Sequence, residues 1–212
     1  MPAQLSLHPA RTTVLSMDLQ VGIVSIYLKD QELLTRAANV LQHARAAGMR
    51  VIHVTVGFRP NLPEVSTDNR LLAAVKSSPQ HQRLFQGPAA AIHPTLGPEA
   101  DDIVITKHRV SAFTGTDFEM ILRANNIDTL VLFGIATSGV VLSTIREAAD
   151  TDYRLVVIKD CCADLDQELH ECLLDKLFPT QADVLTASEF LSRRKLLRLP
   201  HSPGPASPSS LP

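Results

Sequence analysis

Short runs of consecutive apolar residues recur along the chain and alternate with segments of helical periodicity. The runs are rich in β-branched residues and do not alternate with polar ones, which is typical of strands covered on both faces of a parallel sheet. They predict five strands and a weaker sixth, at 12–17, 50–56, 102–106, 129–134, 154–159 and 182–186.

The segments between these runs carry apolar residues at helical spacing. One stripe covers 33–44 and stops before Gly48, a residue typical of helix C-termini. The segments 116–119 (TDFE) and 186–189 (TASE) have the form of capping boxes, and further helices are expected after Ser138 and after Asp164. Strands that alternate with helices predict a doubly wound, three-layer α/β/α fold.

Two segments interrupt this rhythm. Residues 57–100 are rich in Pro and Gly, with one helical piece near 71–75, and are expected to be a lid, a binding loop, an oligomer contact or a plain surface excursion. The Pro/Ser-rich end at 199–212 is predicted to be a disordered tail, which leaves 1–198 as a single domain.

Composition and charge exclude several classes of function. Of 212 residues, 20 are basic and 22 acidic, and the net charge of −2 argues against a binder of nucleic acid or of a membrane surface. The longest apolar stretch, 129–142, is broken by Gly134 and Thr137 and is too short to span a bilayer. The N-terminus shows no secretion signal, and three cysteines without a CxxC pair indicate reduced thiols and a cytoplasmic protein.

Polar residues directly after the strands are the candidates for chemistry, because ligands of open α/β sheets bind at the carboxyl ends of the strands. These positions are Asp18, Lys107, the turn 134–141 and Asp160. A lysine beside a carboxylate would hold it ionised and stabilise developing negative charge. Taken alone, Asp18 also fits a helix cap and Lys107 a surface lysine.

Cofactor and metal motifs are missing. The first strand–helix turn reads MDLQVGIV, which matches neither a dinucleotide-binding nor a phosphate-binding loop. The histidines are scattered and are interpreted as packing or surface residues, so that no metal and no cofactor are expected. They include His43, His53, His81, His93 and His170.

The order of these residues resembles the isochorismatase-like hydrolase superfamily, which includes nicotinamidases, carbamoylsarcosine amidases and ureidoacrylate-type amidohydrolases. The resemblance covers about 12–190 and rests on Asp18, on VITKHRVSAFTGTDFEMIL around Lys107, and on GIATSGVVLSTIREAAD after the fourth strand. It implies a six-stranded parallel, Rossmann-like sheet of order 3-2-1-4-5-6 and a homo-oligomer, a dimer or a tetramer.

The resemblance also implies roles for single residues. The family's aspartate acid/base falls on Asp18 and its lysine on Lys107. The nucleophilic cysteine, six residues after the turn glycine, falls on Val140, which has no lone pair with which to attack a carbonyl. Cys161, Cys162 and Ser138 are the alternative nucleophiles, although a hydroxyl on the turn would more naturally cap the helix.

The isochorismatase branch offers a precedent without the cysteine, since its aspartate acts as a general acid that protonates an enol carbon. The turn here, GIATSG, is nevertheless more similar to that of the amidases, because Ser138 stands where isochorismatases carry a histidine.

Three hypotheses follow for a small-molecule substrate or ligand. The chain is a hydrolase that works without the cysteine, an inactive ligand-binding or assembly relative, or an amidohydrolase of C–N bonds with a displaced nucleophile. Backbone N–H groups of the turn are expected to form an oxyanion cradle, and a few further side chains to contact the substrate. The cradle comprises Ala136, Thr137, Ser138 and Gly139, and the contacts Gln20, Phe113 and Arg109 or Arg59.

Overall fold

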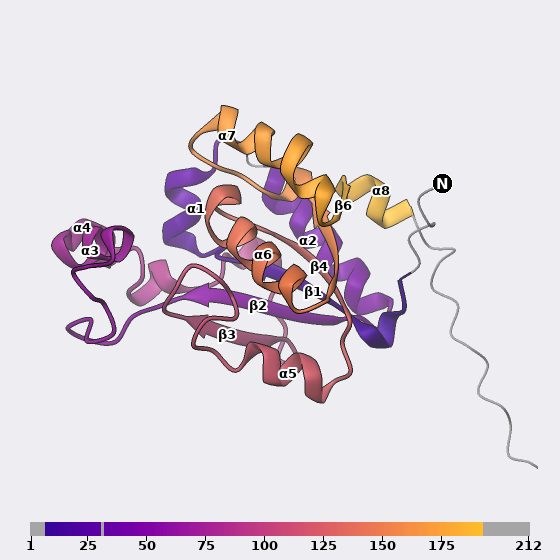
Figure 1. Cartoon of the computed structure of the whole chain (residues 1–212), viewed down its shortest axis with the longest axis horizontal. Coiled ribbons are helices and arrows are strands. Elements are labelled where there is room, and N and C mark those ends of the chain that lie inside the picture. Colours follow the sequence, from indigo (N-terminus) through magenta and orange to yellow (C-terminus); the bar gives the residue numbers. More distant parts are fainter. Residues whose placement is uncertain (1–6, 31, 193–212) are drawn as a thin grey trace, which may run out of the picture.

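The computed structural model describes residues 7–30 and 32–192, and its centre is a six-stranded parallel sheet of order β3-β2-β1-β4-β5-β6 (Figure 1). This confirms the predicted fold class and strand order. The predicted tail at 199–212 and the end of the domain at 198 lie outside the described residues. The strands are β1 (Thr12–Met17), β2 (Arg50–Val56), β3 (Ile103–Lys107), β4 (Thr129–Gly134), β5 (Arg154–Ile158) and β6 (Asp183–Leu185).

The strand predictions are confirmed most closely at the centre of the sheet. β1, β2 and β4 have the predicted bounds, and every residue of β1 and β4 is buried. β3 begins and ends one residue later than expected, so that Lys107 is its last residue and pairs in register with Val56. Central strands are covered on both faces, which is why their continuous apolar runs identified them so well.

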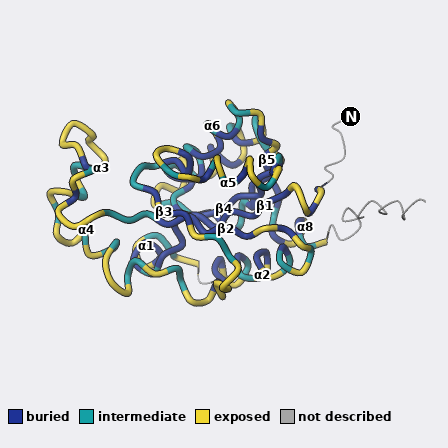
Figure 2. The backbone as a smooth tube through the Cα atoms, turned by 90° about the horizontal axis from the view of Figure 1, so that it is seen from below, coloured by how far each residue is buried: buried dark blue, intermediate teal, exposed yellow. Residues whose placement is uncertain are grey.

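Helices cover both faces of the sheet. In Figure 2, α5 and α6 lie on one side of the buried strands, and α1, α2 and α8 lie on the other. The helices are α1 (Val21–Tyr27), α2 (Glu32–Ala46), α3 (Arg70–Ser77), α4 (Pro79–Arg83), α5 (Phe118–Ala124), α6 (Leu142–Asp150), α7 (Gln167–Cys172) and α8 (Ala187–Ser192).

The two predicted capping boxes have different outcomes. At α8, Glu189 Oε2 accepts from the Thr186 backbone N–H at 2.7 Å and Thr186 Oγ1 accepts from the Glu189 N–H at 3.2 Å, as predicted. At α5 the prediction is wrong, since the helix begins after Asp117. The Thr116 hydroxyl donates to the Ala112 carbonyl at 2.7 Å and accepts from the Phe118 N–H at 3.2 Å, which fixes the turn before the helix.

Two other helix starts also lie later than expected. Ser138 lies within a single π-helical turn, Thr137–Val141, and α6 begins directly after this turn, at Leu142. α7 is capped by Asp166, whose side chain accepts from the Leu169 N–H at 3.0 Å, because Asp164 has other partners.

The segment 57–100 holds α3 and α4, which project beyond the end of the sheet in Figures 1 and 2. A small apolar cluster of its own, formed by Leu62, Val65 and Leu72, supports it. Gln20 forms an isolated antiparallel bridge with Ile92 and thus ties the end of the segment to the start of α1.

The chain leaves β1 toward β2 and leaves β4 toward β5, so the carboxyl ends of β1 and β4 form the topological switch point of the sheet. Ligands of doubly wound folds bind at such a point. Gly134 ends β4 there with φ of +153°, and a Cβ at this position would overlap the Met17 carbonyl. Glycine therefore allows the two strand ends to approach closely, with Asp18 directly beside them.

Candidate active site

Asp18 and Lys107 form a buried ion pair at the switch point. Asp18 follows β1 with φ of 56°, and its N–H donates to the Val54 carbonyl at 2.8 Å. Its Oδ2 lies 2.8 Å from Lys107 Nζ, which also donates to the Arg109 carbonyl at 3.1 Å. Asp18 is only 6% exposed and Lys107 only 2%. The two predicted residues are thus brought together from β1 and β3.

The second oxygen of Asp18, Oδ1, is buried and has no hydrogen-bond partner in the part of the chain that the structure describes. Burial raises the pKa of this carboxyl, and the Lys107 ammonium opposes the rise without cancelling it. A carboxyl with a raised pKa and a free oxygen, at the ligand-binding edge of a sheet, is suited to give or take a proton.

The turn after β4 lies beside this pair and presents an apolar residue where the cysteine was expected. The Ile135-Ala136 peptide bond is cis, and the π-helical turn follows. Val140 in this turn is 2% exposed. Its isopropyl group can pack against other groups but can neither transfer a proton nor attack a carbonyl.

The prediction of an open oxyanion cradle is wrong for three of its four amides, while the fourth, the N–H of Ala136, has no hydrogen-bond partner within the described residues. The N–H groups of Thr137, Ser138 and Gly139 donate to Ala163 O at 2.9 Å, Asp164 Oδ2 at 2.7 Å and Ala136 O at 3.1 Å, respectively. Asp164 therefore supplies from within the chain the negative charge that the start of a helix favours.

Gln20 and Phe113, predicted as substrate contacts, have structural partners instead. The Gln20 amide donates to the carbonyls of Val56 and Ala90 and accepts from the Val56 N–H. The Phe113 ring packs edge-on against Phe118, with centroids 4.7 Å apart, inside the apolar core. Both side chains hold the loops that surround the site.

Arg109 and Arg59 tie the 57–100 segment to the end of β3. Arg109 donates to the carbonyls of His108 and Glu64, at 2.7 and 3.0 Å. Arg59 Nη1 lies 3.4 Å from His108 Nε2, directly after β3, and 3.8 Å from Glu64 Oε1. A substrate contact by either arginine stays a prediction.

Two of the three alternative nucleophiles, Cys161 and Cys162, are poorly suited to attack. Cys161 and Cys162 are both buried. Burial raises the pKa of Cys162 to about 12 and also raises that of Cys161. Because the thiolate is the reactive form, both groups are almost entirely unreactive at neutral pH. Ser138 is held on the turn through its own N–H, by Asp164.

Three residues near the site escaped the sequence analysis: Tyr27, Asp164 and His170. His170, expected to be isolated, has Nδ1 2.8 Å from the Thr137 hydroxyl. The pKa of Tyr27 is raised by burial and by the carboxylates of Asp164 and Asp18. Helix packing brings these residues together. The only signal of this in the sequence is the position of Asp164 shortly after β5, at the carboxyl edge of the sheet.

No cluster of three or more His, Cys, Asp or Glu side chains within 7–30 and 32–192 is arranged to hold a metal ion. Over the same residues, no helix is both long and apolar enough to cross a membrane.

Comparison with known proteins gives a consistent result. The sequence profile of the isochorismatase domain matches residues 12–189. The uncharacterised isochorismatase family protein YecD of Escherichia coli is 33% identical over 89% of this chain and 98% of its own length. Maleamate amidohydrolase of Pseudomonas putida is 28% identical over 76% of this chain and 74% of its own.

A solved structure agrees with these sequence matches. The isochorismatase family protein of Burkholderia thailandensis superposes with a TM-score of 0.76 at 30% identity. The match covers 89% of this chain and 98% of that one.

Proposed function

The chain belongs to the isochorismatase family of hydrolases, and from this premise we propose that it hydrolyses a small molecule with Asp18 as acid/base and Lys107 as its electrostatic partner, without a cysteine nucleophile. The observation that carries the proposal is the buried Asp18–Lys107 pair, whose free Oδ1 lies at the switch point of the sheet. A structural ion pair needs no such unpartnered oxygen, whereas a group that exchanges a proton with a substrate does.

Water is the nucleophile in this proposal, since Val140 cannot attack and the two thiols after β5 stay protonated. With a vinyl ether, the Asp18 carboxylic acid gives its proton to the enol carbon, and water adds to the resulting cation and returns a proton to the Asp18 carboxylate. The hemiketal then breaks its C–O bond to give a ketone and an alcohol. With an amide, the Asp18 carboxylate takes a proton from water as that water attacks the carbonyl. Asp18 then gives this proton to the nitrogen as the C–N bond breaks, so that the amine leaves in neutral form. Lys107 holds the charge of the carboxylate in either case.

Supported by a different observation, the second candidate is an inactive relative that binds a ligand or assembles. Three of the four amides predicted to stabilise an oxyanion are already bonded to acceptors of the chain itself, including Asp164. In this alternative, the buried ion pair would be retained only for its part in the fold.

One set of assays tests the proposal. Wild type, Asp18→Asn and Val140→Cys are compared on isochorismate, nicotinamide, maleamate and a ureido amide. We expect turnover of one substrate by wild type and a loss of about 10²- to 10⁴-fold in Asp18→Asn, the range of a lost proton-transfer group. A silent wild type, with amidase activity in Val140→Cys alone, would favour the inactive relative.

A further inference from the structure

A second pocket, of about 270 Å³, opens between the end of α1 and the segment that follows β5. Its walls include Tyr27 and Lys29 on one side and Lys159, Ala163 and His170 on the other. Asp18 and Lys107 do not line it. The pocket is therefore a separate feature of the same edge of the sheet.

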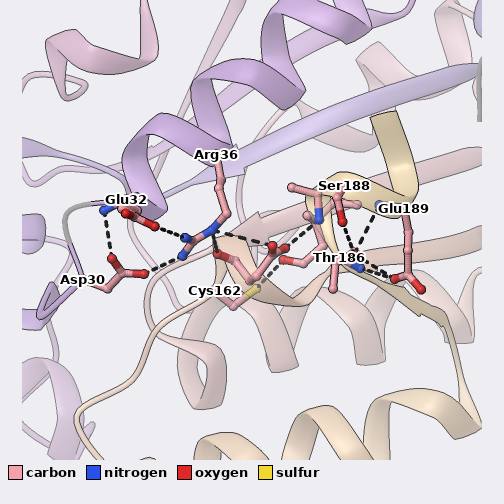
Figure 3. A network of polar contacts seen from close by, with 10 residues as sticks. Asp30, Glu32, Arg36, Cys162, Thr186, Ser188 and Glu189 are labelled. Atoms are coloured by element: carbon pink, nitrogen blue, oxygen red, sulfur yellow. Dashed lines mark hydrogen bonds and ion pairs between the residues drawn. The ribbon is translucent and has the colours of Figure 1, made fainter. Parts of the chain in front are cut away.

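The acidic side chains around this pocket are bonded to groups of the protein itself. Arg36 lies between Asp30 and Glu32 in Figure 3, with Nη2 2.6 Å from Asp30 Oδ2 and Nη1 3.5 Å from Glu32 Oε2. Arg36 also lies 3.6 Å from Asp160 Oδ2, and Asp160 Oδ1 accepts from the Ala187 N–H at the start of α8.

Asp164 is bonded in the same way. Its Oδ2 accepts from Ser138, and its Oδ1 accepts from the Leu165 N–H at 2.8 Å. The carboxylates at the pocket thus have hydrogen-bond partners in Arg36, which three of them share, and in backbone amides.

The ammonium groups of the two lysines in the pocket lining have no such partners. Neither the Lys29 nor the Lys159 side chain makes a hydrogen bond or an ion pair within the described residues. Lys159 is partly buried, and Lys29 is exposed. These two ammonium groups are therefore the charged groups of the lining whose donors are left for a ligand.

Neutral polar groups complete the pocket. His170 bonds through Nδ1 to the Thr137 hydroxyl, so its Nε2 is left for a ligand, and burial lowers its pKa. The Tyr27 hydroxyl has no hydrogen-bond partner among the residues described. His170 joins the pocket directly to the turn that contains Val140.

We propose that this pocket binds a small carboxylate, which Lys29 and Lys159 hold by charge-assisted hydrogen bonds. The ligand also contacts His170, which links it to the turn after β4. Two amines and two neutral polar groups around 270 Å³ suit a molecule of a few carbon atoms. The site does not depend on catalysis by Asp18, so the two proposals can fail independently.

The test is a titration of the full chain with succinate, followed by isothermal calorimetry and by the amide NMR signals of Thr137 and Ser138. Lys29→Gln with Lys159→Gln is expected to weaken binding by about tenfold or more, since hydrogen bonds to charged groups are lost. The charge-retaining pair Lys29→Arg with Lys159→Arg, and Lys76→Gln on α3, outside the pocket lining, are expected to bind as wild type does.

Equal binding by wild type and the double glutamine variant would overturn the proposal, as would the absence of saturable binding to wild type. Maleamate as a second probe separates two sources of the carboxylate. If maleamate also shifts the ¹³C NMR signal of the Asp18 carboxyl carbon, the pocket holds the carboxylate end of a substrate. If maleamate shifts only signals of the pocket residues, the pocket holds a separate ligand.

Discussion

Asp18 and Lys107 are buried together, and the Lys107 ammonium affects the protonation of the Asp18 carboxyl. Burial alone favours the uncharged carboxylic acid, while the ammonium 2.8 Å away favours the carboxylate. Lys107→Met removes the second effect, so we expect the pKa of Asp18 to rise further. The ¹³C NMR signal of its carboxyl carbon, followed against pH, measures this. Lys176→Met serves as the control, and an unchanged titration of Asp18 in Lys107→Met would contradict the prediction.

The pH dependence of activity separates the two roles of Asp18. Its pKa is raised above 3.8, so the acid form persists in the folded state to a higher pH than in the unfolded chain. Stability from this group is complete below the unfolded pKa and is lost as pH rises through the folded one. A general acid predicts that kcat falls as pH rises through the folded pKa, and a general base predicts that it increases.

That profile is measured on wild type once a substrate is identified, with the Asp18 NMR titration as the reference. If kcat changes at a pH unrelated to the pKa of Asp18 in that titration, the proton transfer belongs to another group.

His53 is a second buried titratable residue, remote from the proposed chemistry. Its Nε2 lies 3.2 Å from Asp102 Oδ2, and Arg45 Nε donates to Asp102 at 3.1 Å. Burial lowers the pKa of His53 below 6.5, although Asp102 opposes this effect. The unfolded chain therefore takes up the proton first, and the free energy of unfolding should fall as pH decreases below about 6.5.

Urea unfolding of wild type and His53→Gln between about pH 7 and pH 5 tests this, at about 1.4 kcal/mol for each tenfold difference in proton affinity. We expect a smaller loss in the variant, because glutamine does not titrate. Parallel curves for the two proteins would show that other groups cause the loss.

At the scale of elements, the close approach of the ends of β1 and β4 depends on Gly134. A Cβ there would overlap the Met17 carbonyl, whereas a Cβ at Gly97, where φ is 55°, meets nothing within 4 Å. We expect Gly134→Ala to destabilise by about 3 kcal/mol or more, and Gly97→Ala by about 1 kcal/mol, from backbone strain alone. Urea unfolding measures both, and equal effects would mean that β1 and β4 can separate without cost.

The elements were predictable where one physical effect dominates. Continuous apolar runs predicted β1 and β4, which are buried throughout. The capping-box pattern predicted the start of α8, where Thr186 and Glu189 form reciprocal bonds. At Thr116 the motif placed the helix start one residue too early: the hydroxyl oxygen accepts from the Phe118 N–H at 3.2 Å in the turn before α5 rather than from Glu119, and the motif alone does not reveal this local bonding.

The site divides in the same way. Asp18 and Lys107 could be placed together, because the carboxyl ends of parallel strands meet at one edge. Two other contacts could not be predicted, because they depend on how the segment after β5 packs. They are the bond between Thr137 and His170 and the bond from the turn amide of Ser138 to Asp164. Gln20 was assigned to the substrate for a related reason: only the structure reveals that backbone groups occupy its amide.

At the scale of the whole molecule, the family resemblance leads us to propose a homo-oligomer. Light scattering of the purified chain should give two or four times the 23.1 kDa of one chain. A mass equal to one chain would contradict it.

The pairing of β1 with β4 also determines when the site can form. Asp18 is made early in synthesis, but β1 acquires its second neighbour only after residues as far as Gly134 have been added. Such distant contacts close slowly, and until then the edge of a strand that is buried in the finished fold is left open to aggregation. The proposed ligand-binding centre is therefore assembled late, and binding there would report that β1 and β4 have paired.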